Sequence, residues 1–123
     1  MGHVRVAIKL ANPETRDGAV EVKEALVDTG ATWTTVPRDI AKHLGLRLVG
    51  QMTVRTAAGP QTLDQSYAKI DLGQKTMVTP VLVSDTYPGV LIGVITLEGL
   101  GLAVDPTSGR LVDSELLLLI SLA

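Results

Sequence analysis

The chain has 123 residues and a net charge of −2, with 46% hydrophobic residues and almost no aromatic ones. This length predicts one domain over residues 1–123 with an aliphatic core, and the lack of a basic stripe or stacking aromatics excludes nucleic acid as a partner. The absence of Cys excludes disulfides, thiolate nucleophiles and Cys-based zinc sites.

The first half of the chain has the pattern of strands followed by one short helix. Val4 to Leu10 alternates apolar and polar residues, which indicates a half-buried strand. Ala19 to Asp28 predicts a second strand, whose apolar end delivers Asp28 into the interior. Pro37 to Gly45 has the signals of a helix: an early Pro, apolar residues four apart, and a final Gly.

The second half predicts hairpins and one more short helix. The expected strands are Met52–Thr56, Gln61–Leu63, Tyr67–Leu72, Thr76–Ser84, Val90–Ile92, Leu102–Asp105 and Arg110–Val112, with two helical turns over Val94–Leu100. Glycine-containing turns separate most of these segments. Seven to nine short strands with two short helices predict a mostly β fold.

An acidic residue stands at the end of an apolar strand. Asp28 directly follows Ala25-Leu26-Val27, and a buried carboxylate without partners is costly. The residues after Asp28 are rich in hydroxyls and include Gly30, so they can hydrogen-bond a carboxylate and let a substrate backbone approach. Taken alone, Asp-Thr-Gly is also an ordinary turn sequence.

The wider context favours a catalytic interpretation. Residues 25–37, ALVDTGATWTTVP, resemble the active-site segment of the retropepsin-like aspartic proteases. A second landmark of that family, two apolar residues, Gly and a short helix, is matched by Leu91-Ile92-Gly93 and the segment through Leu100. Leu102 to Leu111 is similar to the closing hairpin of cellular and bacterial members. The resemblance covers residues 4–112 and implies a closed β-barrel-like acid-protease fold in a C2 homodimer.

The resemblance also implies roles for individual residues. Asp28 would be the catalytic carboxylate, supported by Thr29, Gly30 and Ala31 in its loop, and the hairpin from Met52 to Leu63 would be the flap. Gly93 would pack beside the Asp28 loop. The expected pocket and flap residues are Trp33, Val36, Ala57, Ala58, Gly59, Leu91 and Ile92.

The chain departs from the family pattern at two places. Viral members carry a charged or amide pair after the Gly of the second landmark, where this chain has Val94-Ile95. Any ion pair between chains at that point would therefore be missing. The flap has one Gly followed by Pro60, which predicts a stiffer hairpin than a glycine-rich flap and bears on the size of substrate that fits.

Aspartic-protease chemistry needs two carboxylates that share a proton, one acting on water and one on the scissile carbonyl. No Asp other than Asp28 is followed by Thr-Gly or Ser-Gly. A second copy of the chain would supply the missing carboxylate at a two-fold axis. The apolar run from Leu116 to Leu122 favours association too, although it could instead fold back onto its own barrel.

The sequence therefore predicts a homodimeric aspartic endopeptidase that cleaves peptide or protein substrates with activated water. The alternative is a dimeric β-barrel module for binding or scaffolding that keeps the fold without cleavage. With His3 and His43 as the only histidines, we expect neither a metal nor another cofactor. The N-terminus lacks the apolar stretch of a signal peptide and no run is long enough to span a membrane, so a cytoplasmic location is expected.

Overall fold

A computed structural model describes residues 4–15 and 18–114, and the apolar run over 116–122 lies outside them. The elements in chain order are β1 (Val4–Ala11), β2 (Val20–Val27), β3 (Thr34–Pro37), α1 (Arg38–Leu44), β4 (Gly50–Thr56), β5 (Gly59–Leu72), β6 (Lys75–Ser84), β7 (Leu91–Ile92), α2 (Val94–Gly99), β8 (Leu102–Asp105) and β9 (Arg110–Asp113). The expectation of a mostly β fold with two short helices is confirmed. Neither helix in this part of the chain is long and apolar enough to cross a membrane.

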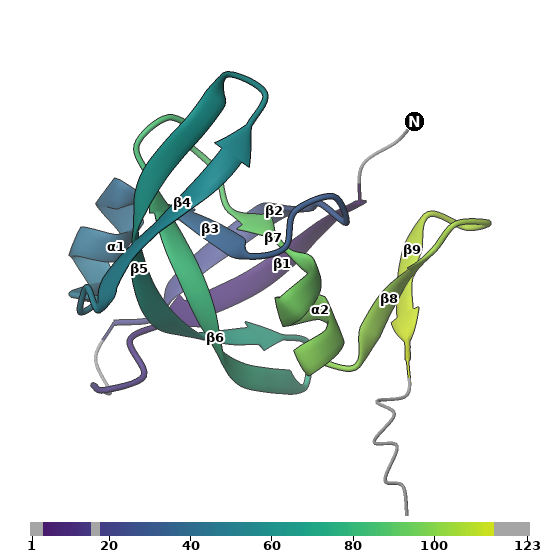
Figure 1. Cartoon of the computed structure of the whole chain (residues 1–123). Helices are drawn as coiled ribbons and strands as arrows, with labels where there is room; N and C mark the ends of the chain where they lie inside the picture. The colour runs from purple at the N-terminus through teal and green to yellow at the C-terminus, as the bar shows by residue number, and fades with distance from the viewer. Residues whose placement is uncertain (1–3, 16–17, 115–123) are drawn as a thin grey trace, which may run out of the picture.

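One seven-stranded sheet closes on itself. Its order is β1-β2-β7-β3-β6-β5-β4, and an additional pairing of β1 with β5 completes a ring of six strands. β4 continues beyond the ring as the partner of β5, and the two form a hairpin that projects from the barrel (Figure 1). β8 and β9 form a separate two-stranded sheet beside α2. The fold thus leaves two hairpins outside the ring.

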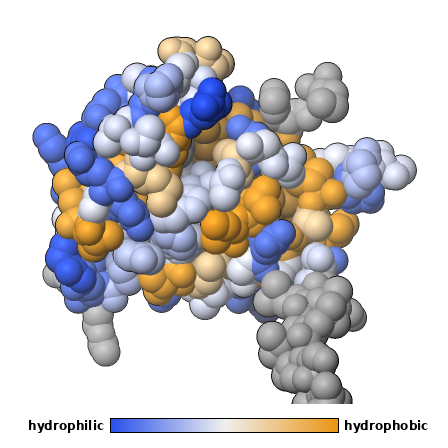
Figure 2. Space-filling view, viewed as in Figure 1, coloured by the Kyte–Doolittle hydropathy of each residue, from blue (hydrophilic) through white to orange (hydrophobic). Residues whose placement is uncertain are grey.

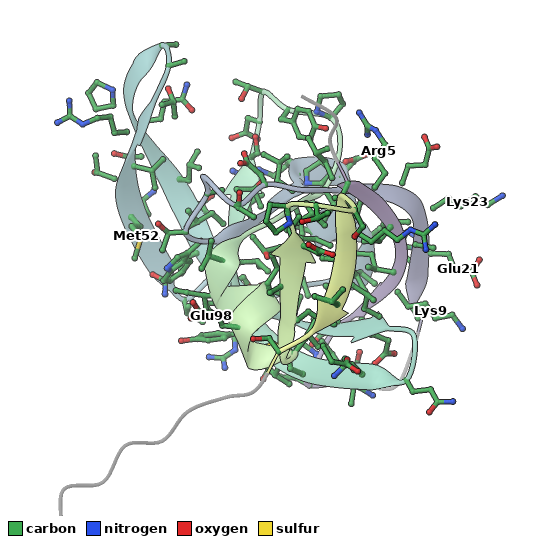
Figure 3. The ribbon with its side chains drawn as sticks, turned by 90° about the vertical axis from the view of Figure 1, so that its right-hand side faces the viewer. Arg5, Lys9, Glu21, Lys23, Met52 and Glu98 are labelled. Carbon is green, nitrogen blue, oxygen red and sulfur yellow. The ribbon has the colours of Figure 1, made fainter. Side chains whose placement is uncertain are left out.

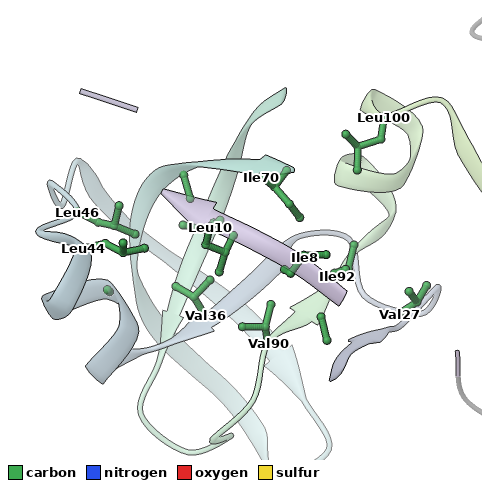
Figure 4. Packing of buried hydrophobic residues seen from close by; sticks show 14 of the residues in the cluster. Ile8, Leu10, Val27, Val36, Leu44, Leu46, Ile70, Val90, Ile92 and Leu100 are labelled. Carbon is green, nitrogen blue, oxygen red and sulfur yellow. The ribbon is translucent and has the colours of Figure 1, made fainter. Parts of the chain in front are cut away.

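The interior of the barrel is filled by aliphatic side chains. Leu10, Ile70, Val36 and Ile92 are fully buried, and they converge from strands far apart in the sequence (Figure 4). Every buried hydrophobic residue of the described chain is Ala, Val, Leu or Ile, in agreement with the scarcity of aromatics. Burying these side chains away from water is the main contribution that holds the strands together.

The structure differs from the expected strand pattern in two places. Gln61–Leu63 and Tyr67–Leu72 belong to one strand of 14 residues, β5. Ser66 lies between them and is buried, with its hydroxyl donating to the carbonyl of Arg47 at 2.6 Å. β3 was not expected as a strand, because its four residues gain their strand geometry from pairing with β6 and β7.

The helix expected between Pro37 and Gly45 is present as α1. It begins after Pro37 and ends at Gly45, whose φ of 64° is a left-handed conformation that favours glycine. The buried side chain of Asn12 donates to the carbonyls of Leu44 and Gly45, at 3.1 and 3.0 Å. The end of α1 is thereby fixed to the end of β1.

Candidate active site

The loop that follows β2 holds the Asp28 carboxylate in a defined position. The Asp28 N–H donates to the carbonyl of Ile92 at 3.0 Å, and the Ala31 N–H donates to the Asp28 carbonyl at 3.1 Å. The carboxylate Oδ1 accepts the Gly30 N–H at 2.9 Å. Asp28 is half-buried, whereas Thr29 and Gly30 are exposed. The carboxylate is therefore oriented by its own loop, beside two exposed residues.

Gly93 and the first turn of α2 hold the other side of this loop. The N–H groups of Val94 and Ile95 donate to the carbonyls of Ala31 and Thr32, at 2.8 and 3.1 Å. The Gly93 N–H donates to the Thr34 hydroxyl at 3.1 Å. The structure thus brings together the two segments that the sequence singled out, although they are separated by about 60 residues along the chain.

Three buried threonine hydroxyls lie behind the loop. The Thr96 oxygen is 2.6 Å from that of Thr34 and 2.7 Å from that of Thr79, and all three residues are fully buried. These bonds join α2, β3 and β6 and satisfy hydroxyls that would otherwise be costly to bury. No local pattern in the sequence indicates these bonds, because the partners come together only through the tertiary fold.

A cleft of about 580 Å³ opens beside the Asp28 loop. Thr35 lies in its floor, with its register partners Leu82 and Leu91 on the two neighbouring strands. The β4–β5 hairpin forms one wall, and the segment over residues 84–87 forms the other. The lining residues are Gly30, Ala31, Thr32, Trp33, Thr35, Met52, Val54, Arg55, Thr56, Gln61, Leu63, Leu82, Ser84, Thr86, Tyr87 and Leu91.

The apolar wall of the cleft faces away from the charged side of the barrel. Figure 3 shows Met52 on the hairpin, while the charged side chains of β1 and β2, such as Lys9 and Glu21, point outward on the opposite side. Lys9 and Glu21 form an exposed ion pair at 3.9 Å.

Some of the expected pocket residues line this cleft and others do not. Trp33 and Leu91 line it, together with Gly30 and Ala31 of the Asp28 loop. Val36 and Ile92 are instead fully buried in the core, because neighbours in a strand point to opposite faces and Thr35 and Leu91 take the face toward the cleft. Ala57, Ala58 and Gly59 lie at the tip of the hairpin and are not among the lining residues.

The tip of the hairpin is closed by a threonine and a glycine. The Thr56 hydroxyl donates to the Gly59 carbonyl at 2.7 Å and accepts the Ala58 N–H at 3.2 Å. Gly59 has a φ of 107°, which L side chains rarely adopt, while Ala57 and Ala58 keep negative φ. The sequence located this turn correctly because glycine marks it.

An ion-pair cluster joins the two walls outside the cleft. We call it the Arg38 cluster; it consists of Arg38, Gln51, Asp64 and Asp85. Arg38 Nη1 is 2.8 Å from Asp64 Oδ2, and its Nε and Nη2 bind both oxygens of Asp85 at 2.9 and 3.0 Å. The Gln51 amide donates to the other oxygen of Asp64 at 3.1 Å. Sequence reasoning missed this cluster, because its members come from four separate segments.

The Arg38 cluster changes the acidity of its members. The hydrogen bond from Arg38 holds the pKa of the Asp64 carboxyl below its usual value, and the amide of Gln51 acts in the same direction. The pKa of Asp85 is also lowered, chiefly by the hydrogen bonds from Arg38. The same bonds raise the pKa of Arg38. All three groups are therefore charged at neutral pH.

The surface between the β4–β5 hairpin and α2 is weakly polar to hydrophobic. Figure 2 shows pale, weakly polar residues between the hairpin and α2, bordered by hydrophobic patches over α2 and beside β8 and β9. Ile95 at the start of α2 and Val112 in β9 are 36% and 42% exposed.

Residues 4–15 and 18–114 contain no group of three or more His, Cys, Asp or Glu side chains that could hold a metal ion.

Comparisons with known proteins identify the family of the chain and the fold it shares. The model of the family described as "gag-polyprotein putative aspartyl protease" matches residues 17–99. The solved structure of EIAV protease complexed with the inhibitor HBY-793 superposes with a TM-score of 0.64 and 18% sequence identity, over 95% of this chain and 94% of that one. The fold is therefore that of a retroviral protease. No curated protein sequence matches the chain.

Proposed function

The chain belongs to the gag-polyprotein aspartyl protease family, and from this premise we propose that it is a homodimeric aspartic endopeptidase. The observation that carries the proposal is the position of Asp28. Its half-buried carboxylate is oriented by the Gly30 N–H, and Gly30 and Ala31 of the same loop line a cleft of about 580 Å³. A cleft of this size accommodates side chains of a bound peptide.

The reaction requires a second carboxylate, which Asp28 of a second copy would supply. One carboxylate takes a proton from water, and the water oxygen attacks the scissile carbonyl carbon while the other, protonated carboxyl donates to the carbonyl oxygen. The tetrahedral intermediate then collapses, the amine leaves with a proton, and the C–N bond breaks.

Pairing of two chains is supported by the surface around Asp28. Thr29 and Gly30 are exposed beside it, and Ile95, whose N–H donates to the carbonyl of Thr32 in the same loop, adds a partly exposed apolar side chain. None of the described residues that line the cleft is Asp or Glu, so the cleft offers Asp28 no partner carboxylate from its own chain. A two-fold axis next to Asp28 would bring the Asp28 of a second copy into place as the second carboxylate.

The cleft favours peptides with large apolar side chains near the scissile bond. The residues that line the cleft include Trp33, Met52, Leu63, Leu82 and Leu91. A substrate side chain that leaves water for this surface gains about 25 cal/mol per Å² of buried apolar area. We therefore expect aliphatic or aromatic residues to be preferred in this part of a substrate.

Cleavage of a peptide library by the wild type and by Asp28→Asn tests the proposal. The wild type should cleave, and Asp28→Asn should not, while both fold and associate alike in sedimentation runs. Asp71→Asn is the matched control, because Asp71 of β5 pairs with Lys9, at the opposite end of β1 from Val4, the partner of Val27 beside Asp28. Cleavage that survives in Asp28→Asn would remove the proposal, as would a wild type that binds peptides without cleaving any.

A further inference from the structure

The Arg38 cluster lies where the two walls of the cleft separate. Asp64 is the last residue of β5, toward the hairpin tip, that pairs with β6; its partner there is Val83. Beyond Asp64 the hairpin pairs only with itself in the described chain, and Gln51 of β4 is the residue opposite Asp64. Arg38 therefore binds the hairpin at the point where it leaves the rest of the sheet.

The other carboxylate of the cluster stands at the base of the opposite wall. Asp85 follows Ser84, the last residue of β6, and lies between two cleft-lining residues, Ser84 and Thr86. Similarly, Asp64 adjoins the cleft-lining Leu63. One guanidinium thus joins the two points from which the walls diverge, Asp64 within β5 and Asp85 just after β6.

The geometry of these contacts is well suited to fixing a distance. Arg38 meets Asp85 through two parallel N–H···O bonds and Asp64 through a third, all between 2.8 and 3.0 Å. Paired bonds to a planar guanidinium restrain orientation as well as distance, which a lysine ammonium does not do. The Arg38 and Asp64 side chains are only 30% and 21% exposed, so water competes less for this pair than for a fully exposed one.

We propose that Arg38 is a positioning residue for substrate, which sets the separation of the β4–β5 hairpin from the segment over residues 84–87 and so keeps the cleft at a width that accepts a peptide. This inference rests on the proposed function. Arg38 is not itself among the cleft-lining residues and acts through Asp64 and Asp85. Its loss therefore weakens substrate binding more than the chemical step at Asp28.

The test compares Arg38→Gln and Arg38→Lys with Arg47→Gln. Arg47 is a matched control, because it also forms an arginine–carboxylate pair, with Glu14 at 2.9 Å, but is exposed and outside the cleft lining. Peptide KM and kcat are measured for each. Binding of an uncleavable statine peptide is followed by the fluorescence of Trp33, the only tryptophan, which lines the cleft.

For Arg38→Gln we expect KM and the statine-peptide Kd to rise roughly tenfold with kcat within about threefold of wild type. The KM and Kd of Arg38→Lys should lie between those of wild type and Arg38→Gln, because lysine keeps the positive charge but cannot form the paired bonds of a guanidinium. Arg47→Gln should match wild type. A merely structural role would lower Tm without this split between KM and kcat. If Arg38→Gln does not fold, Asp85→Asn replaces it, since Asp85 is 61% exposed, and its KM should rise as well.

Two failures are distinguishable. If the wild type cleaves peptides and Arg38→Gln has the same KM and Kd, the positioning role is wrong while the protease assignment stands. If the wild type neither cleaves peptides nor binds the statine peptide, the proposed function fails and takes this inference with it.

Discussion

Gly93 lies so close to the backbone of Trp33 that no side chain fits between them. A Cβ atom at Gly93 would stand 2.5 Å from the carbonyl carbon of Trp33 and 2.9 Å from the carbonyl oxygen of Thr32. Both obstacles are backbone, so relief requires moving the loop that begins at Asp28. The close approach of these two segments is therefore what fixes the loop.

Gly93→Ala should consequently disturb both stability and activity. We expect a loss of about 1 to 3 kcal/mol in the free energy of unfolding, the usual cost of overpacking, together with reduced peptide cleavage. Chemical denaturation checks the first and peptide hydrolysis the second. Gly50→Ala is the control, because its Cβ would meet only Gln65 Oε1 at an ordinary 3.6 Å. Equal stability of the two variants would contradict the account.

Adjacent threonines in β3 should respond oppositely to the same substitution. Thr34 is fully buried and its hydroxyl bonds to Thr96 and the Gly93 N–H, so Thr34→Val should destabilise by about 1 to 3 kcal/mol. The side-chain hydroxyl oxygen of Thr35 is buried and has no hydrogen-bond partner in the described part of the chain. Thr35→Val should therefore raise the unfolding free energy, by about 1 kcal/mol.

Thermal unfolding of the two threonine variants tests whether their stabilities change in opposite directions. The prediction is a higher Tm for Thr35→Val and a lower Tm for Thr34→Val, each relative to wild type. A fall in Tm for both would mean that the Thr35 hydroxyl is satisfied in solution.

The Arg38 cluster should make stability depend on acidic pH. Asp64 and Asp85 have lowered pKa values in the folded chain, with Arg38 as the main cause and Lys42 adding to the effect on Asp85. A lowered folded pKa means that the stabilisation is present above the unfolded value and is lost as pH falls through the folded one. Wild type should therefore lose stability below about pH 4.

Arg38→Gln provides the comparison for that pH dependence. Without the guanidinium the two carboxyls have less reason to stay ionised, so the loss between about pH 4 and pH 2 should be shallower than in wild type. Urea unfolding at several pH values measures both slopes. Parallel curves for the two proteins would show that these carboxylates do not couple to folding.

Local signals in the sequence located the Asp28 loop, α1 and the hairpin tip, because an apolar strand end, Pro37 and Gly59 each mark them. β3 and the full length of β5 could not be predicted in this way. β3 has only four residues and depends on pairing with β6 and β7, and β5 continues through polar residues that find partners in the fold.

In the candidate site, too, some features could be predicted from local sequence signals and others could not. Trp33 and Leu91 were expected at the cleft and line it, whereas the strand alternation that turns Val36 and Ile92 into the core needs the register of β3 and β7. The Arg38 cluster joins residues 26 and 47 positions apart, and no pattern in a single sequence indicates such pairs.

To learn whether two chains share one site through Asp28, wild type is mixed with Asp28→Asn at a fixed total concentration and the subunits are allowed to exchange. A mixed dimer has one carboxylate and should be inactive. Activity should therefore follow the square of the wild-type fraction and fall to about a quarter at an equal mixture. A linear fall, to about half, would mean that each chain works alone and would contradict the account.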